Sequence, residues 1–103
     1  MTEVVFKKSV FLKTLDALSE QFKLASPVGL LCTEKTTGQF ELILAREAEK
    51  GNALLQAFGP CVIKGPDVKV NFNVEQLRGQ ITATSVDKEW VTLHVGGGTM
   101  FVA

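Results

Sequence analysis

The residues of this sequence that could do chemistry are few, and they do not form a recognisable catalytic set. His94 is the only histidine, and it lies between Leu93 and Val95 in a run typical of a β-strand. A histidine acting as a general base needs a nucleophile beside it, and the sequence gives no convincing serine or cysteine partner. The favoured interpretation is a strand histidine that faces solvent or an interface. We therefore predict no catalytic residues and a protein that is not an enzyme.

The two cysteines, Cys32 and Cys61, lack the CxxC spacing of redox and zinc sites. Cys32 lies inside an apolar run, and Cys61 directly follows Gly59-Pro60. Cysteine is often buried as a small apolar residue, so buried reduced thiols explain this placement best. A Cys32–Cys61 disulfide stays the alternative.

Two further segments resemble ligand sites only in composition. Gly96-Gly97-Gly98 could suggest a phosphate cradle, but such loops open a helix, whereas β-prone residues follow here. A hairpin turn is the better prediction. The charged segment Arg46–Lys50 alternates in sign and is typical of a solvated surface. No spacing of metal ligands is present, so we predict neither a metal site nor a cofactor.

The composition is that of one globular domain spanning 1–103. Hydrophobic residues make up 46% of the chain and charged residues 21%. The 11 lysines and arginines equal the 11 aspartates and glutamates, so the net charge is zero. This balance argues against strong autonomous binding to nucleic acid, which needs clustered cations, and against a polybasic membrane anchor. It permits self-association.

No segment of the sequence predicts a membrane partner. The N-terminal residues lack the apolar core of a signal peptide, and no apolar run approaches the ~20 residues that span a bilayer. We therefore expect a cytoplasmic protein.

The chain follows the same course twice, and each course begins with a strand and an amphipathic helix. In the first course we expect a strand at Thr2–Lys7 and a helix capped by Ser9 that ends before Ser26-Pro27. The apolar stripe of this helix is predicted to be Phe11, Leu12, Leu15, Leu18 and Phe22. A hairpin of Val28–Thr33 and Gln39–Ala45 should follow, and then a loop, with at most one or two helical turns, at Arg46–Asn52.

The second course opens with a short strand at Cys61–Ile63 and a half-buried strand with Val68, Val70 and Phe72 on one face. Asn73 is expected to cap the second helix, and Gly79 to serve close packing. The inward residues of this helix should be Val74, Leu77 and Ile81. Strands are expected at Thr82–Val86, Trp90–Val95 and Thr99–Val102.

This doubled pattern predicts an α+β fold. Its pseudo-repeat halves run from about 1 to 56 and from 57 to 103, and each follows a β-α-β-β course. Because each unit leaves an unburied face that its twin can cover, we expect two helices packed on antiparallel sheet.

The order of these elements resembles one domain of the DNA sliding clamps, the superfamily of the bacterial β-clamp and the eukaryotic processivity rings. The resemblance rests on four stretches: FKKSVFLKTLDALSEQ, GQFELILAREA, ALLQAFGPCVIKGPDVKVNFNVEQLRGQI and EWVTLHVGGGTMFVA. It is one of pattern over nearly the whole chain, without a signature motif. It implies two βαβββ-like units with both helices packed on one side of antiparallel sheets. It also implies a ring of six such domains, joined edge to edge through strands, whose helices line a channel around double-stranded DNA.

The resemblance also implies DNA-facing residues. Lys13 and Arg78 hold the matching positions on the two helices, and Lys7 and Lys8 lie near the entrance of the first. The family's channels are markedly basic, whereas these helices also carry Asp16, Glu20 and Glu75 and are nearly neutral.

Two hypotheses for function follow. The first is a non-enzymatic, clamp-like accessory of DNA replication that acts through oligomer or protein contacts. The alternative is a small interaction module or inhibitor, phage-type or regulatory, that binds a partner protein through an exposed strand edge or apolar patch. Phe58 and Phe101 are the aromatic residues we expect at an interface in either case.

Overall fold

The computed structural model describes residues 1–21, 28–48, 51–84 and 87–103. Two helices and eight strands make up this part of the chain. In chain order they are β1 (Thr2–Lys7), α1 (Lys8–Gln21), β2 (Val28–Glu34), β3 (Gln39–Ala48), β4 (Gly51–Pro60), β5 (Val62–Lys64), β6 (Lys69–Asn73), α2 (Val74–Thr84), β7 (Trp90–Gly96) and β8 (Thr99–Val102).

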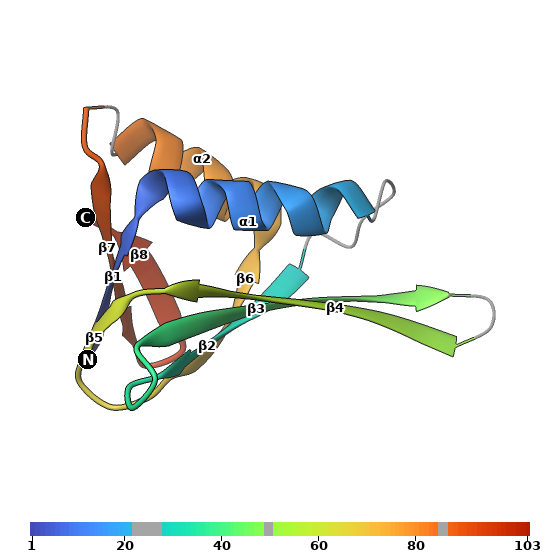
Figure 1. Ribbon diagram of the computed structural model, residues 1–103, viewed down its shortest axis with the longest axis horizontal. Coiled ribbons are helices and arrows are strands. Elements are labelled where there is room, and N and C mark those ends of the chain that lie inside the picture. Colours follow the sequence, from blue (N-terminus) through green and yellow to red (C-terminus); the bar gives the residue numbers. More distant parts are fainter. Residues whose placement is uncertain (22–27, 49–50, 85–86) are drawn as a thin grey trace.

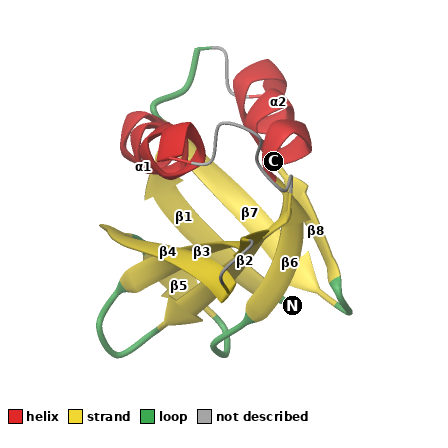
Figure 2. Cartoon of the chain, turned by 90° about the vertical axis from the view of Figure 1, so that its right-hand side faces the viewer, coloured by secondary structure: helices red, strands yellow, loops and turns green. Residues whose placement is uncertain are grey.

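The strands form two antiparallel sheets of four strands each. Sheet A has the order β5-β1-β7-β8, and sheet B has the order β4-β3-β2-β6. Both helices lie on the same side of the sheets, as Figures 1 and 2 show. The predicted α+β fold with both helices on one side is therefore confirmed. Neither described helix is long and apolar enough to cross a membrane.

The core lies between the helices and the inner faces of the two sheets. Its centre is a cluster of three fully buried phenylalanines: Phe6 from β1, Phe11 from α1 and Phe40 from β3. The rings of Phe6 and Phe11 stack with centroids 4.2 Å apart, and Phe40 packs on Phe11 at 5.1 Å. Replacing such a ring by alanine costs about 3–5 kcal/mol, so this cluster fixes α1 against both sheets.

Alternating apolar residues decide which face of each strand is buried. On β1, Val4 and Phe6 are buried while Val5 is only half-buried. The register sets Val4 opposite Leu93 of β7, so that two inward residues face each other. In sheet B, Gly59 lies opposite Phe40, and a Cβ on Gly59 would come within 2.3 Å of the Phe40 ring. This glycine therefore makes room for the central aromatic cluster.

Helix α1 begins at Lys8, so the prediction that Ser9 caps it is wrong. The Lys8 N–H donates to the Glu89 carbonyl at 2.7 Å, which satisfies a first-turn donor from a distant loop. The predicted stripe is confirmed where it is described, since Phe11, Leu15 and Leu18 are buried and Leu12 packs against the core. Phe22 and the predicted helix end before Ser26-Pro27 lie outside the described residues.

Helix α2 has the predicted cap and the predicted inward face. The Asn73 Oδ1 accepts from the Gln76 N–H at 2.9 Å. The buried residues of the helix are Val74, Leu77 and Ile81. The expectation that Gly79 serves close packing is wrong, because this residue is exposed and a Cβ there would meet no atom within 4 Å.

The strand predicted at Thr82–Val86 is also wrong as far as it is described, because α2 continues to Thr84. The Thr82 hydroxyl donates to the Arg78 carbonyl one turn earlier, a bond that serine and threonine hydroxyls make within helices. Residues 85 and 86 lie outside the described chain.

The loop predicted at Arg46–Asn52 is wrong for its described residues. β3 runs to Ala48, β4 starts at Gly51, and the pairing extends through Arg46 opposite Ala53 and Glu47 opposite Asn52. The polar residues of this segment favoured a loop in the sequence analysis. In the structure, the hydrogen-bonded pairing of β3 with β4 begins at the buried end of the hairpin and continues through the polar segment. Residues 49 and 50 lie outside the described chain.

Candidate functional site

His94, the only histidine, lies in the middle of β7 on the outer face of sheet A, away from the helices. Its ring stacks on Phe101 with centroids 4.8 Å apart. Its Nδ1 lies 3.8 Å from the Glu3 Oε1, beyond hydrogen-bond range, so the contact is an ion pair only when the imidazole is protonated. The Glu3 carboxylate and the Phe101 ring contact this histidine, and neither carries a hydroxyl or thiol that the imidazole could activate as a general base.

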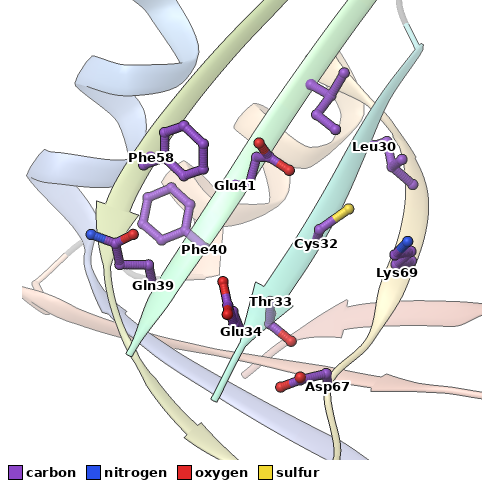
Figure 3. Close-up of a pocket in the computed structure, with 11 residues that line it drawn as sticks. Leu30, Cys32, Thr33, Glu34, Gln39, Phe40, Glu41, Phe58, Asp67 and Lys69 are labelled. Atoms are coloured by element: carbon purple, nitrogen blue, oxygen red, sulfur yellow. The ribbon is translucent and has the colours of Figure 1, made fainter. Parts of the chain in front are cut away.

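A shallow hollow of about 400 Å³ lies on the outer face of sheet B (Figure 3). Cys32 lies in it between Glu41 of β3 and Lys69 of β6, its partners in the strand register. Burial raises the pKa of the Cys32 thiol, the Glu41 carboxylate raises it further, and Lys69 lowers it. A thiol with a raised pKa is a poor nucleophile, so the hollow offers no activated cysteine.

Cys61 is equally unreactive by this criterion, because burial raises the pKa of its thiol to about 11. Both cysteines are free, which confirms the prediction of reduced thiols, although each is half-buried rather than buried. Among the described residues no three His, Cys, Asp or Glu side chains are grouped to hold a metal ion.

The triple glycine forms the turn between β7 and β8, as predicted. Gly97 and Gly98 have positive φ angles of 59° and 78°, which glycine adopts without the strain that a side chain would bring. β8 follows this turn directly, so the segment does not open a helix that could hold a phosphate.

The described residues of the two helices carry no excess of positive charge. The charged residues of α1 are Lys8, Lys13, Asp16 and Glu20, two of each sign. α2 carries one of each, Glu75 and Arg78. Each helix is therefore formally neutral, and residues 8–21 and 74–84 do not form a strip of phosphate-binding cations.

Lys7 and Arg78, which are predicted to face DNA, lie in ion pairs. The guanidinium of Arg78 contacts Asp16 on α1 at 2.8 Å and also Glu75 on its own helix. The Lys7 Nζ lies 2.8 Å from the Glu89 Oε1. The Arg78–Asp16 pair links the two helices, while Lys13 points from α1 as an exposed residue. The assignment of these cations to DNA stays a proposal.

The two aromatic residues predicted at an interface are both exposed on outer sheet faces. Phe58 on β4 is 59% exposed, and Phe101 on β8 is 49% exposed. Sequence reasoning did not single out Trp90 and Val62, which are exposed to similar extents. A signal was present, because both residues alternate with inward-facing neighbours along their strands.

Comparison with solved structures identifies the architecture. A sliding clamp from Bartonella birtlesii, titled a DNA polymerase III subunit beta, matches with a TM-score of 0.79 at 13% identity and covers 99% of this chain. The DNA polymerase III beta subunit of Thermotoga maritima matches with a TM-score of 0.77 at 13% identity and covers 99% of this chain. The pol III beta of Caulobacter crescentus matches with a TM-score of 0.75 at 16% identity and covers 100% of this chain. The chain has the fold of a sliding-clamp domain.

This clamp-like domain spans about a quarter of the length of those proteins: 28% of the Bartonella chain and 26% of each of the other two. No family model and no curated sequence matches it. At these identities the likeness concerns the fold. The neutral helix side described above belongs to this chain and has to be explained within the clamp-like architecture.

Proposed function

We propose that this chain is a cytoplasmic, non-enzymatic, clamp-like accessory of DNA replication that works as an assembly of several copies or with protein partners. The observation that carries the proposal is the match of 99% or more of the chain to domains of bacterial sliding clamps. One such domain cannot enclose a duplex. A ring therefore requires about six copies of this chain, or a partner that supplies the other domains.

The neutral helix side is compatible with a topological mode of holding DNA. A closed ring stays on circular DNA because circular DNA has no end from which the ring could slide off, whatever the charge of the channel. A protein that binds through phosphate contacts instead loses affinity steeply as salt rises. We expect retention on circular DNA to resist salt, with weak binding to short linear duplexes.

Lys13 is the residue that we propose contacts the duplex backbone most directly, because it is exposed on α1. Arg78, Lys7 and Lys8 are proposed to contribute less. The first two are held by carboxylates of this chain, and Lys8 is half-buried at the start of α1. Exposed ion pairs are worth ~0–1 kcal/mol, so phosphates can compete with these carboxylates.

The test combines mass and topology. Light scattering should give a mass of about six times the 11.2 kDa of one chain if the protein forms a ring by itself. The assembled protein should stay on a closed circular plasmid through a high-salt wash and leave it after one double-strand cut. A stable monomer that is not retained on either form would refute an autonomous clamp and would support the small interaction module instead.

A further inference from the structure

The outer face of sheet A is a sheet face that the fold leaves uncovered. Alternation along β1 sends Val4 and Phe6 into the core, so Glu3, Val5 and Lys7 point to the opposite face. Figures 1 and 2 show the helices and sheet B on the core side of sheet A. Within the described chain, no helix or strand packs on the outer side.

This outer face carries an exposed apolar patch. Val62 of β5, Trp90 of β7 and Phe101 of β8 are each about half exposed. Val5 of β1 lies opposite Val62 in the strand register, and the Phe101 ring stacks on His94 of β7. Exposed apolar patches rimmed by polar residues mark interaction surfaces on soluble proteins. The outer face of sheet A therefore has the composition of such a surface.

The charged residues of this face lie in rows that run across the strands. One row crosses all four strands from β5 to β8, and its residues in that order are Lys64, Glu3, His94 and Phe101. At the other end of the face, Lys7 of β1 lies opposite Trp90 of β7. Each row has a cation toward the β5 side and an aromatic ring toward the β8 side. Each row is therefore complementary to its own reverse.

We propose that a second copy of this chain packs face to face on the outer side of sheet A, related by a two-fold axis parallel to the strands and midway between β1 and β7. The axis places β5 of one copy over β8 of the other, and β1 over β7. Sheets that pack in this way lie about 10 Å apart, with strand directions within about 30°. The proposal goes beyond the function proposed above, because it uses neither the helix side nor the strand edges.

The complementary charges identify the second copy as the occupant. Across the axis, Lys64 faces Phe101 of the partner subunit and Lys7 faces Trp90 of the partner subunit, so each ammonium group lies over an aromatic ring. Glu3 faces His94 of the partner subunit, and an imidazole keeps an N–H donor for a carboxylate even when it is neutral. A uniformly acidic or basic partner would match only one half of each row. A copy of the same face matches both halves.

The size of the face predicts a reversible dimer. Four strands about 4.8 Å apart and five residues at about 3.4 Å each give the face a projected area of about 300 Å². Two such faces lie at the small end of specific interfaces, so we expect half-dimerisation on the order of 10 μM. The zero net charge of the chain places no net repulsion between the copies.

Trp90 reports on this contact directly, because it is the only tryptophan of the chain and is 57% exposed. Its emission should shift to shorter wavelengths as the protein concentration rises from about 1 to about 100 μM. The mass from light scattering should rise in parallel from 11.2 kDa to twice that value. Assembly through strand edges would leave the emission unchanged, since β7 is an inner strand of sheet A.

Phe101→Lys and a matched control test the face. Phe101→Lys sets a second cation opposite Lys64 of the partner subunit, so we expect half-dimerisation to need an at least about tenfold higher concentration. Phe58→Lys makes the same change at a residue of similar exposure on the outer face of sheet B, and should change this concentration by less than about twofold. Circular dichroism and thermal melting establish that each variant is folded.

A charge exchange tests the two-fold axis itself. Glu3→Lys sets a cation opposite His94 of the partner subunit, and His94→Glu sets a carboxylate opposite Glu3 of the partner subunit. Each variant alone should dimerise at least about tenfold more weakly than the wild type, because like charges or two cationic groups then meet. An equal mixture should dimerise like the wild type, since the introduced lysine faces the introduced glutamate and the remaining Glu3 faces the remaining His94. A variant that merely fails to fold would not be rescued.

Three results would overturn the proposed contact: a wild-type chain that stays monomeric at about 100 μM, equal weakening by Phe101→Lys and Phe58→Lys, or a mixture of the charge variants that stays monomeric. The plasmid assay separates this inference from the proposed function. Plasmid retention by an assembly of about six chains with unchanged Trp90 emission would remove the contact and keep the clamp. A dimer with shifted emission and no plasmid retention would keep the contact and remove the autonomous clamp.

Discussion

Removing the Asp16 carboxylate should strengthen the binding of linear DNA if the helix side faces the duplex. Asp16 is 55% exposed on α1 and holds the guanidinium of Arg78 across the gap between the helices at 2.8 Å. Asp16→Asn keeps the size of the side chain, makes α1 positive by one charge and frees one arm of Arg78 for a phosphate. Loss of this exposed ion pair should cost less than about 1 kcal/mol of stability.

The expected gain follows from counterion release. One additional phosphate contact steepens the slope of log K against log salt by about 0.9, which amounts to about an eightfold higher affinity at 0.1 M salt than the same contact provides at 1 M. Fluorescence anisotropy with a short linear duplex, measured over a salt series, gives both the affinity and the slope.

Glu34→Gln is the matched control, because it removes the same charge at an exposed residue that ends β2, beside the β2–β3 turn, which lies far from the helices (Figure 1). We expect it to change the affinity by less than about twofold, since exposed charges separated by more than a Debye length of ~10 Å are largely screened. Equal gains for both variants would indicate a general charge effect. No gain for Asp16→Asn would refute the reasoning that places DNA at the helix side.

Three further predictions concern the fold. Asn73→Ala should lower the free energy of unfolding by about 1 kcal/mol in urea titrations, because the Gln76 N–H loses its acceptor, while Asn73→Asp should retain most of it. Gly59→Ala should destabilise the chain, because the added Cβ would meet the Phe40 ring. Gly79→Ala should instead stabilise it by about 0.5–1 kcal/mol, because a Cβ there meets no atom within 4 Å. Equal shifts in melting temperature for the two variants would contradict this pair of predictions. Burial raises the pKa of the Cys61 thiol to about 11. The protonated thiol therefore stabilises the folded state below the ordinary thiol pKa of ~8.5, and this stability should be lost as the pH rises from there to about 11. Cys61→Ser should reduce the fall of the free energy of unfolding over this pH range. Equal rates of Cys61 alkylation in the folded and the unfolded protein at about pH 8.5 would refute the prediction.

Local patterns predicted the elements whose own residues dictate them. Three of these patterns depend only on residues close together in the chain: the alternation of Val4 and Phe6, the apolar stripe of Phe11 and Leu15, and the helix cap at Asn73. Two of the errors occurred where a distant segment decides. α1 begins at Lys8 because the Glu89 carbonyl accepts its N–H, and the polar end of β3 stays a strand because β4 pairs with it.

The functional surfaces divide in the same way. The sequence alone showed the neutral balance of the helices and the scarcity of chemical groups, because these depend only on composition. It could not show that Asp16 neutralises Arg78 from the other helix, or that Cys32 lies between Glu41 and Lys69.

The sequence by itself determined that this chain folds as a doubled α+β unit with little catalytic chemistry, since apolar periodicity and residue types are local properties. Only the tertiary structure decided which edges stay open. β1 pairs with β7 and β2 pairs with β6, so each sheet contains strands from both courses of the chain. As a result, β4 and β8 lie at the ends of different sheets. Strand order depends on contacts between segments far apart in the chain, and those contacts determine which strands lie at the sheet edges.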